Sequence, residues 1–175
     1  MLVNLQDLPA NGRQWNWTLP KSLLEDPLRG TVDALVDLES DVVWNGEIRA
    51  DGQIFILQGQ WCLTLKRQCD RCNMIFSFVM QGESVQDFSL FPLGKEMLEE
   101  DEIDTCEHLD PPGLVDLLDV LRESVWLAYK PVVVCDGGCL GLCQHCGVNL
   151  NIESCKCTQT HVNSAFAALK NIKFD

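Results

Sequence analysis

The chain has 175 residues, 46% of them apolar, and a formal net charge of −13. This composition supplies a hydrophobic core and excludes a disordered chain. No apolar run reaches the roughly 20 residues that a membrane-spanning helix needs, and the first residues lack the basic and apolar regions of a secretory signal. We therefore expect an intracellular, cytoplasmic protein without a membrane span.

The negative charge is concentrated before residue 130. Residues 1–129 carry 9 Lys/Arg and 23 Asp/Glu, whereas residues 130–175 carry 4 and 3. An acidic body repels a phosphate backbone, so binding to nucleic acid driven mainly by charge is not expected. Two interpretations of the acidic surface stay open: it attracts basic protein partners, or it only confers solubility.

Alternating apolar residues predict an antiparallel meander in the first half of the chain. Trp15, Trp17 and Leu19 alternate as in an edge strand, and residues 31–38 have the same period. Asp51-Gly52 predicts a two-residue hairpin between strands at 42–50 and 53–67. A further strand follows, in which the alternating apolar residues are Met74, Phe76, Phe78 and Met80.

The stretch from 95 to 112 breaks this pattern. It holds eight acidic residues and ends in two prolines, so we expect a loop that is either a docking segment or a solvated connection. Residues 113–128 have apolar residues at helical spacing, which predicts one long helix capped by Asp110. A shorter amphipathic helix is expected over residues 163–172.

The ten cysteines carry the strongest chemical signal. In an intracellular chain, CxxC spacings favour metal ligation over disulfides. Two sets of four thiolates would hold two structural zinc ions, so we expect about two zinc ions per chain. The eight candidate ligands are Cys69, Cys72, Cys135, Cys139, Cys143, Cys146, Cys155 and Cys157.

Spacing also divides these ligands. The last four cysteines form a self-contained set, a CxxC followed by a turn and a CxC, which leaves Cys135 and Cys139 to join Cys69 and Cys72. The predicted fold class is therefore α+β, an antiparallel β meander with one long helix and a cysteine-rich zinc-knuckle C-terminal region. Residues 1–134 would form the mainly β body with the acidic loop and the helix. Residues 135–175 would form a zinc-binding segment with a short terminal helix, packed on that body.

The remaining cysteines and histidines have weaker signals. Cys62 lies between Trp61 and Leu63 and is expected to be a small buried side chain, whereas Cys106 should be a free thiol in the acidic loop. His145 lies inside a CxxC, but the thiolates suffice as ligands without it. The deaminase and metalloprotease zinc motifs and the nucleotide-binding glycine motifs are absent from the sequence, so we expect no enzyme. The alternative function is a zinc-containing thiol redox protein or a redox-switched chaperone.

Three blocks of the sequence are specific enough to compare with a known family. They are QCDRC at Gln68–Cys72, VLRESVWLAYKPVVVC at Val120–Cys135, and CLGLCQHCGVNLNIESCKC at Cys139–Cys157. Together they resemble the YceD family, the large ribosomal RNA subunit accumulation proteins of bacteria and plastids. The third block, with its C-x-x-C-G-x-N-L-N and C-x-C, is the most specific of the three.

The resemblance implies a non-catalytic factor for accumulation of large-subunit ribosomal RNA, which acts by binding in subunit assembly or RNA processing. It would work in the cytoplasm, or in the plastid stroma if the source is a plant. The expected partner is a basic ribosomal protein or a pre-ribosomal particle. Lys66, Arg67 and Arg71, beside the first CxxC, either contact ribosomal RNA or form only a solvated strand end.

Overall fold

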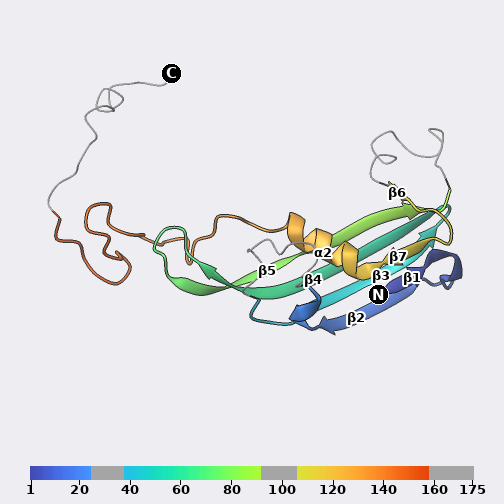
Figure 1. Cartoon of the computed structure of the whole chain (residues 1–175), viewed down its shortest axis with the longest axis horizontal. Coiled ribbons are helices and arrows are strands. Elements are labelled where there is room, and N and C mark those ends of the chain that lie inside the picture. Colours follow the sequence, from blue (N-terminus) through green and yellow to red (C-terminus); the bar gives the residue numbers. More distant parts are fainter. Residues whose placement is uncertain (25–37, 92–105, 158–175) are drawn as a thin grey trace, which may run out of the picture.

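A computed structural model describes residues 1–24, 38–91 and 106–157. Its main sheet has the strand order β2-β3-β4-β5-β6, and a small sheet pairs β1 with β7 (Figure 1). The main strands are β2 (Arg13–Leu19), β3 (Val42–Asp51), β4 (Ile54–Gln68), β5 (Ile75–Ser89) and β6 (Cys106–His108). The remaining elements are β1 (Leu2–Asn4), η1 (Leu5–Asp7), η2 (Lys21–Leu23), β7 (Leu114–Asp116) and α2 (Leu117–Leu127). The predicted α+β class is confirmed.

The predicted hairpin between β3 and β4 is present, but its turn lies one residue later than the predicted Asp51-Gly52. Asp51 pairs with Ile54, so Gly52 and Gln53 form the two-residue turn between β3 and β4. Gly52 has φ = +63°, a conformation that residues with a Cβ rarely adopt. This turn fixes which residues of β3 and β4 face the core.

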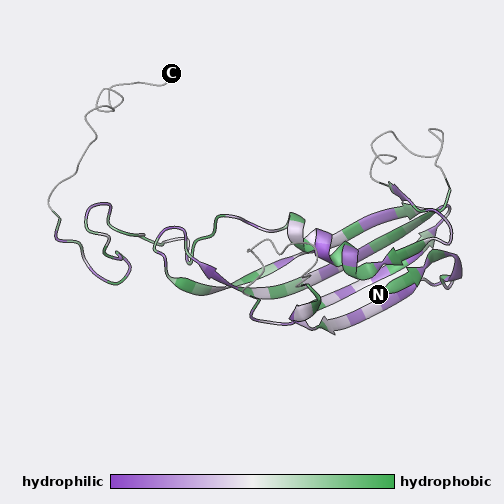
Figure 2. Cartoon of the chain, in the orientation of Figure 1, coloured by the Kyte–Doolittle hydropathy of each residue, from purple (hydrophilic) through white to green (hydrophobic). Residues whose placement is uncertain are grey.

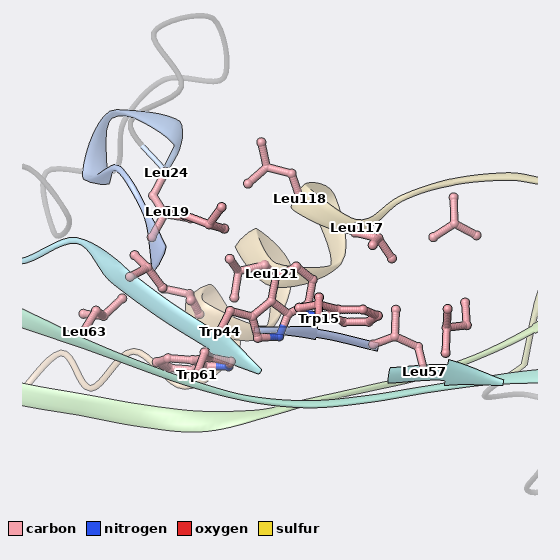
Figure 3. Packing of buried hydrophobic residues seen from close by; sticks show 14 of the residues in the cluster. Trp15, Leu19, Leu24, Trp44, Leu57, Trp61, Leu63, Leu117, Leu118 and Leu121 are labelled. Carbon is pink, nitrogen blue, oxygen red and sulfur yellow. The ribbon is translucent and has the colours of Figure 1, made fainter. Parts of the chain in front are cut away.

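Tryptophans and glycines alternate on the core face of the sheet. Trp17, Trp44 and Trp61 lie directly opposite one another on β2, β3 and β4. Trp61 also lies over Gly82 of β5, where an added Cβ would come within 2.6 Å of the indole ring. Gly46 and Gly59 are covered in the same way by Trp15 and Trp44. The indoles thus lie over glycines of the neighbouring strands, and Trp15, Trp44 and Trp61 are buried (Figure 3).

Helix α2 covers this core face, as Figures 1 and 3 show. Its buried residues are Leu117, Leu118, Leu121 and Val125, which confirms the predicted apolar stripe. Ser124 of the helix and Ser84 of β5, both at the packing surface, share a hydrogen bond of 2.9 Å between their hydroxyls. The eleven-residue helix is too short to span a bilayer, and the part of the chain that the structure describes holds no long apolar helix of that kind.

The start of the helix was predicted wrongly. Residues 114–116 form β7, which pairs with β1, so the helix begins at Leu117 and not at residue 113. Its N-cap is Asp116, whose carboxylate accepts a hydrogen bond of 3.0 Å from the Leu118 amide, and not Asp110. Pairing with another strand overrides the helical period of these three residues, and that pairing cannot be seen in a local pattern.

The acidic loop was also predicted too long. Residues 106–108 at its end form β6, which pairs in parallel with β5, so the sheet is not a pure antiparallel meander. Three residues are too few to give a periodic signal. Leu38 forms an isolated bridge with Leu65. The rest of the strand predicted at 31–38, the acidic residues 95–105 and the helix predicted at 163–172 lie outside the described residues.

Figure 2 shows that hydropathy alternates along the strands. One face of the sheet is apolar and faces α2, and the opposite face is polar. Cys62 lies on this polar face and is exposed, so the prediction of a small buried side chain was wrong. The reason is the two-residue period of the strand, because its neighbours Trp61 and Leu63 both occupy the core face.

Candidate metal centres

The first CxxC lies in the turn between the two longest strands, β4 and β5. The Cys69 amide donates to the Met74 carbonyl at 2.8 Å, and the Asn73 amide donates to the Cys69 carbonyl at 2.9 Å. Asn73 has φ = 60°, a left-handed conformation that asparagine tolerates better than most residues. The turn therefore curls back on itself and directs both cysteine side chains inward, where Cys69 and Cys72 are buried.

The two residues between these cysteines fasten the C-terminal segment to the turn. The Asp70 amide donates to the Val133 carbonyl at 2.9 Å, and an Asp70 carboxylate oxygen accepts from the Val133 amide at 2.6 Å. The Arg71 carbonyl accepts from the Leu142 amide at 3.1 Å, and its guanidinium donates to the Cys139 carbonyl at 3.3 Å. These four bonds bring the end of the sheet and the segment after α2 together.

Arg67, near the end of β4, makes a second set of contacts with the segment after α2. Its guanidinium donates to the carbonyl oxygens of Lys130 and Pro131 at 3.0 and 3.2 Å. It also lies 4.7 Å from the centre of the Tyr129 ring, which is cation–π distance. The chain leaving the helix is thereby held against β4 before it reaches Cys135.

The first candidate centre is formed by Cys69, Cys72, Cys135 and Cys139, whose Sγ atoms all lie within 4.8 Å of one another. The Sγ atoms of Cys69 and Cys139 are 3.9 Å apart, and those of Cys72 and Cys135 are 3.7 Å apart. Four sulfurs at about 2.3 Å from a tetrahedral zinc ion would be separated by about 3.8 Å. The four thiols therefore fit one such ion, and Phe76, Val134 and Leu142 pack around them.

The second candidate centre is formed by Cys143, Cys146, Cys155 and Cys157. A small hairpin carries it: the Cys143 amide donates to Val148, and the Gly147 amide donates back to Cys143, at 2.8 and 2.9 Å. Gly147 has φ = +73°, as this tight turn requires. The Cys155 Sγ lies 3.2 Å from that of Cys143 and 3.6 Å from that of Cys146. Two groups of four cysteines that could each hold a metal ion are thus present, with the memberships expected from spacing.

Backbone amides around the sulfurs set the acidity of each group. Burial acts to raise the pKa of Cys69, but amide groups of Cys135, Arg71 and Cys72 donate to its sulfur and bring the pKa down to about 6. Amides of Cys146 and His145 lower the pKa of Cys143 to about 6 in the same way. Each group therefore contains one cysteine that is mostly thiolate at neutral pH, the form in which cysteine binds metal.

The pKa is raised for two thiols in each group, Cys72 and Cys135 in the first and Cys155 and Cys157 in the second. Burial and the neighbouring thiols raise the pKa of Cys135 to about 12. Hydrogen bonds with the thiols of Cys155 and Cys146 raise the pKa of Cys157 to about 12. In the metal-free protein four crowded sulfurs cannot all be charged, so a cation with two positive charges is what would allow them to be.

One residue that sequence reasoning missed connects the two groups. The Asn151 side-chain amide donates to the Sγ of Cys139 at 3.4 Å, although Asn151 lies between the cysteines of the second group. Its carbonyl oxygen accepts from the Leu140 amide at 2.8 Å. Asn151 ends the G-V-N-L-N stretch, so its place between two cysteine pairs was the available signal. Asp70 was missed as well, and its place inside the first CxxC was the corresponding signal.

The other candidate residues lie away from these groups. Among the described residues, His145 and Cys106 belong to neither four-cysteine group, and the His145 amide donates to the Cys143 sulfur at 3.4 Å. Cys106 is half-buried in β6, and burial raises the pKa of its thiol. Of the three basic residues considered for RNA contact, Lys66 lies 3.8 Å from a carboxylate oxygen of Glu39, and Arg67 and Arg71 make the backbone contacts given above.

These features define a class: a small α+β protein in which one four-cysteine group joins the turn between β4 and β5 to the segment after α2, and a second group lies within that segment. Sequence comparison gives the particular family. The chain belongs to the YceD family, because the model described as "Large ribosomal RNA subunit accumulation protein YceD" matches residues 57–173. The match begins in β4 and includes all eight cysteines of the two groups.

One curated relative is the Arabidopsis thaliana protein "Large ribosomal RNA subunit accumulation protein YCED homolog 1, chloroplastic". It is 27% identical over 128 residues, which cover 60% of this chain and 40% of the relative. The chain thus spans well under half of that relative's length. No solved structure matches the chain.

Proposed function

We propose that this protein is a non-catalytic factor for accumulation of large-subunit ribosomal RNA, acting by binding during ribosome assembly or RNA processing. The observation that carries the proposal is the family match over residues 57–173, whose description names this role. The name of the Arabidopsis relative supports the same role. Since the match includes both four-cysteine groups, the candidate metal centres belong to the part of the chain that the family shares.

The proposal includes two structural zinc ions, held by Cys69, Cys72, Cys135 and Cys139 and by Cys143, Cys146, Cys155 and Cys157. The sulfur separations in the first group and the amide groups that donate to the sulfurs support zinc, which takes four thiolates in structural sites. Metal analysis of protein purified without chelator should find about two zinc ions per chain. A folded protein that contains no metal and ten reactive thiols would contradict this part of the proposal.

The closed shape of these groups supports a role without catalysis. A catalytic zinc ion keeps one position for water and has an acid–base residue beside it. Here four cysteines would fill all four positions, and in the described part of the chain neither group contains a histidine or carboxylate ligand. A bound zinc ion would therefore hold segments together, with residues 1–134 as the body and residues 135–175 as the zinc-binding part.

A redox-regulated protein is the second candidate, and one observation favours it. Cys146 and Cys157 of the second group are exposed, and the Sγ atoms of Cys143 and Cys155 are only 3.2 Å apart. An oxidant that reaches these thiols would release the metal. Zinc retention under mild peroxide separates the two functions. A binding factor with structural zinc keeps both ions at peroxide concentrations that make a redox switch release its metal.

For partners, we propose a basic ribosomal protein or a pre-ribosomal particle in the cytoplasm, or in the plastid stroma if the source is a plant. The net charge of −13 supports a basic partner. A direct contact of RNA with Lys66, Arg67 and Arg71 is the weaker proposal, because each of these side chains already has a partner within the protein.

A deletion strain tests the role in ribosome formation. We expect a lower ratio of large-subunit to small-subunit ribosomal RNA, and restoration of the ratio by the intact gene. A variant with both groups disrupted, Cys69→Ser with Cys155→Ser, should restore it poorly. A normal ratio in the deletion strain would contradict the proposed function.

A further inference from the structure

The polar face of the sheet carries two rows of directly opposed side chains. The first row runs across four strands as Asn16, Asn45, Gln60 and Glu83. The second row runs beside it as Gln14, Glu47, Gln58 and Val85. We call these eight residues the amide face. Seven of them are exposed and Glu47 is half-buried, whereas α2 and the core lie on the other side of the sheet.

The amide face is hollowed. Its eight side chains line a shallow depression of about 620 Å³, together with Trp15, Gly46 and Gly59. Neighbouring strands lie about 4.8 Å apart, so the first row presents hydrogen-bonding side chains at that spacing on four strands and the second row on three. An elongated, polar ligand would thus meet a regular series of donors and acceptors along the depression.

The chemistry of this face differs from that of a surface that only needs to be soluble. Asparagine is depleted in strands, where threonine and charged residues keep an exposed face soluble at less cost. Here two asparagines and three glutamines occupy strand positions on three neighbouring strands, β2, β3 and β4. The residues lining the depression include Glu47 and Glu83 but no lysine or arginine.

We propose that the amide face binds an extended, lysine- or arginine-rich segment of a protein partner. Side-chain amides can donate to and accept from a peptide backbone, and the two carboxylates can pair with basic side chains. Gln14 donates to one oxygen of Glu47 at 2.9 Å and so holds this carboxylate in place. A phosphate backbone is disfavoured by the same carboxylates and by a body with 23 acidic and 9 basic residues before position 130.

The choice of partner rests on the proposed function, since a factor for the large ribosomal subunit works among basic proteins. The direct test uses the full-length purified protein and a fluorescent peptide of alternating arginine and serine, with binding followed by anisotropy. Oligouridylate RNA serves as the competing probe. We expect the peptide to bind, and Glu47→Lys with Glu83→Lys to weaken its binding on the order of tenfold.

Two controls separate a site from general attraction to an acidic protein. The variant Glu107→Lys with Glu153→Lys has the same net charge, changes exposed residues outside the face, and should weaken binding less than about twofold. The variant Asn45→Thr with Gln60→Thr keeps the net charge and the strand preference, yet should weaken binding about threefold through loss of the amides. Circular dichroism and melting curves check that each variant is folded.

The possible results divide clearly. Absence of peptide binding by the unaltered protein, equal weakening by the two charge-reversed variants, or tighter binding of oligouridylate to the amide face would overturn the inference. The ribosomal RNA ratio in the deletion strain is a separate measurement. If the peptide binds but the ribosomal RNA ratio is normal in the deletion strain, the proposed function is rejected and the binding role of the amide face stands. If the ratio falls but the peptide does not bind, only the role of the amide face is rejected.

Discussion

The two four-cysteine groups differ in how much of the molecule they join. In the first, Cys72 and Cys135 are 63 residues apart, and the thiols connect the end of the sheet with the segment that follows α2. In the second, Cys143 and Cys155 are 12 residues apart, and the thiols connect the turn at residues 143–147 with the CxC that follows it. The first group is largely buried and the second largely exposed. The same chemistry would thus serve the whole fold in one place and a local turn in the other.

The difference has an energetic consequence. Closing the longer loop restricts the unfolded chain more than closing the shorter one, but only by about 1.5 kcal/mol because the dependence is logarithmic. Packing adds to it, since Phe76, Val134 and Leu142 surround the first group. We therefore expect the first centre to affect global stability and the second to affect mainly residues 140–157.

The largest expected effect is on the melting temperature, which Cys69→Ser should lower much more than Cys155→Ser. Loss of one ligand in the buried centre should cost about 3 kcal/mol, by analogy with other buried charged groups that lose a partner, which in a chain of this size lowers Tm by about 10 °C. Cys155→Ser should lower the global Tm by less than about 2 °C. Calorimetry of the zinc-loaded proteins measures both, and equal losses would remove the distinction between the centres.

The next effect, on zinc affinity, is one that the two centres should share. Cys135 and Cys157, each with a pKa of about 12, keep their protons at neutral pH until a metal ion displaces them. The pKa values of Cys72 and Cys155 are also raised, so a bound ion displaces at least two protons in each centre. Raising the pH removes these competing protons, so zinc affinity should rise on the order of a hundredfold per pH unit around neutrality. Below pH 6 the dependence should steepen, as Cys69 and Cys143, each with a pKa of about 6, also become protonated.

Competition with a chelator at several pH values measures this dependence for each centre. The variant Cys155→Ser isolates the first centre for the measurement. A zinc affinity that does not change with pH would show that the bound ion does not displace thiol protons.

A smaller effect should be confined to the first centre. Asp70→Ala removes the carboxylate that accepts from the Val133 amide at 2.6 Å, and should weaken zinc binding at the first centre on the order of tenfold. Asp70→Asn retains an acceptor oxygen and is the matched control, with a loss of about twofold or less. Zinc transfer to a chromogenic chelator follows both variants. Equal losses at both centres would mean that Asp70 acts on the fold as a whole.

The smallest expected effect tests the contact between the two groups. Asn151→Ala removes the amide that donates to the Cys139 sulfur and should speed zinc release from the first centre about two- to threefold. The second centre, whose segment contains Asn151, should change less. Faster release from the second centre alone would show that this amide does not couple them.

The sequence was informative where a pattern is local or repeats. The Asp51-Gly52 signal predicted that a hairpin joins β3 and β4, although the turn itself lies one residue later, at Gly52 and Gln53. The spacing of the last four cysteines predicted which of them lie together. In each case neighbouring residues alone determine the geometry, because a two-residue turn and a knuckle are complete within a few positions.

The sequence was misleading where a distant segment decides the structure. Residues 114–116 have a helical period but pair with β1, more than 100 positions away in the chain. The three-residue strand β6 is defined by its pairing with β5 and has too little length to show a pattern. Arg67 was considered for RNA contact or a solvated strand end, and Asp70 was not considered, yet both bind carbonyl or amide groups of residues 130–133. Such contacts come from tertiary structure, which local propensity does not encode.

The amide face shows a third case. Its residues are scattered over β2, β3, β4 and β5, and, apart from Val85, each looks like an ordinary polar position in a half-buried strand. Only the register brings Asn16, Asn45, Gln60 and Glu83 into one row. The pattern therefore appears once the pairing of all four strands is known.

Stepwise removal of zinc, followed by hydrogen exchange and mass spectrometry, tests the difference between the two centres most directly. With a weak chelator, the first ion to leave should come from the exposed second centre, and faster exchange should be confined to residues 140–157. With a strong chelator, loss of the second ion should raise exchange at the end of β4, the start of β5 and the segment after α2. Simultaneous loss of both ions, or protection that is lost across the sheet at the first step, would contradict this account.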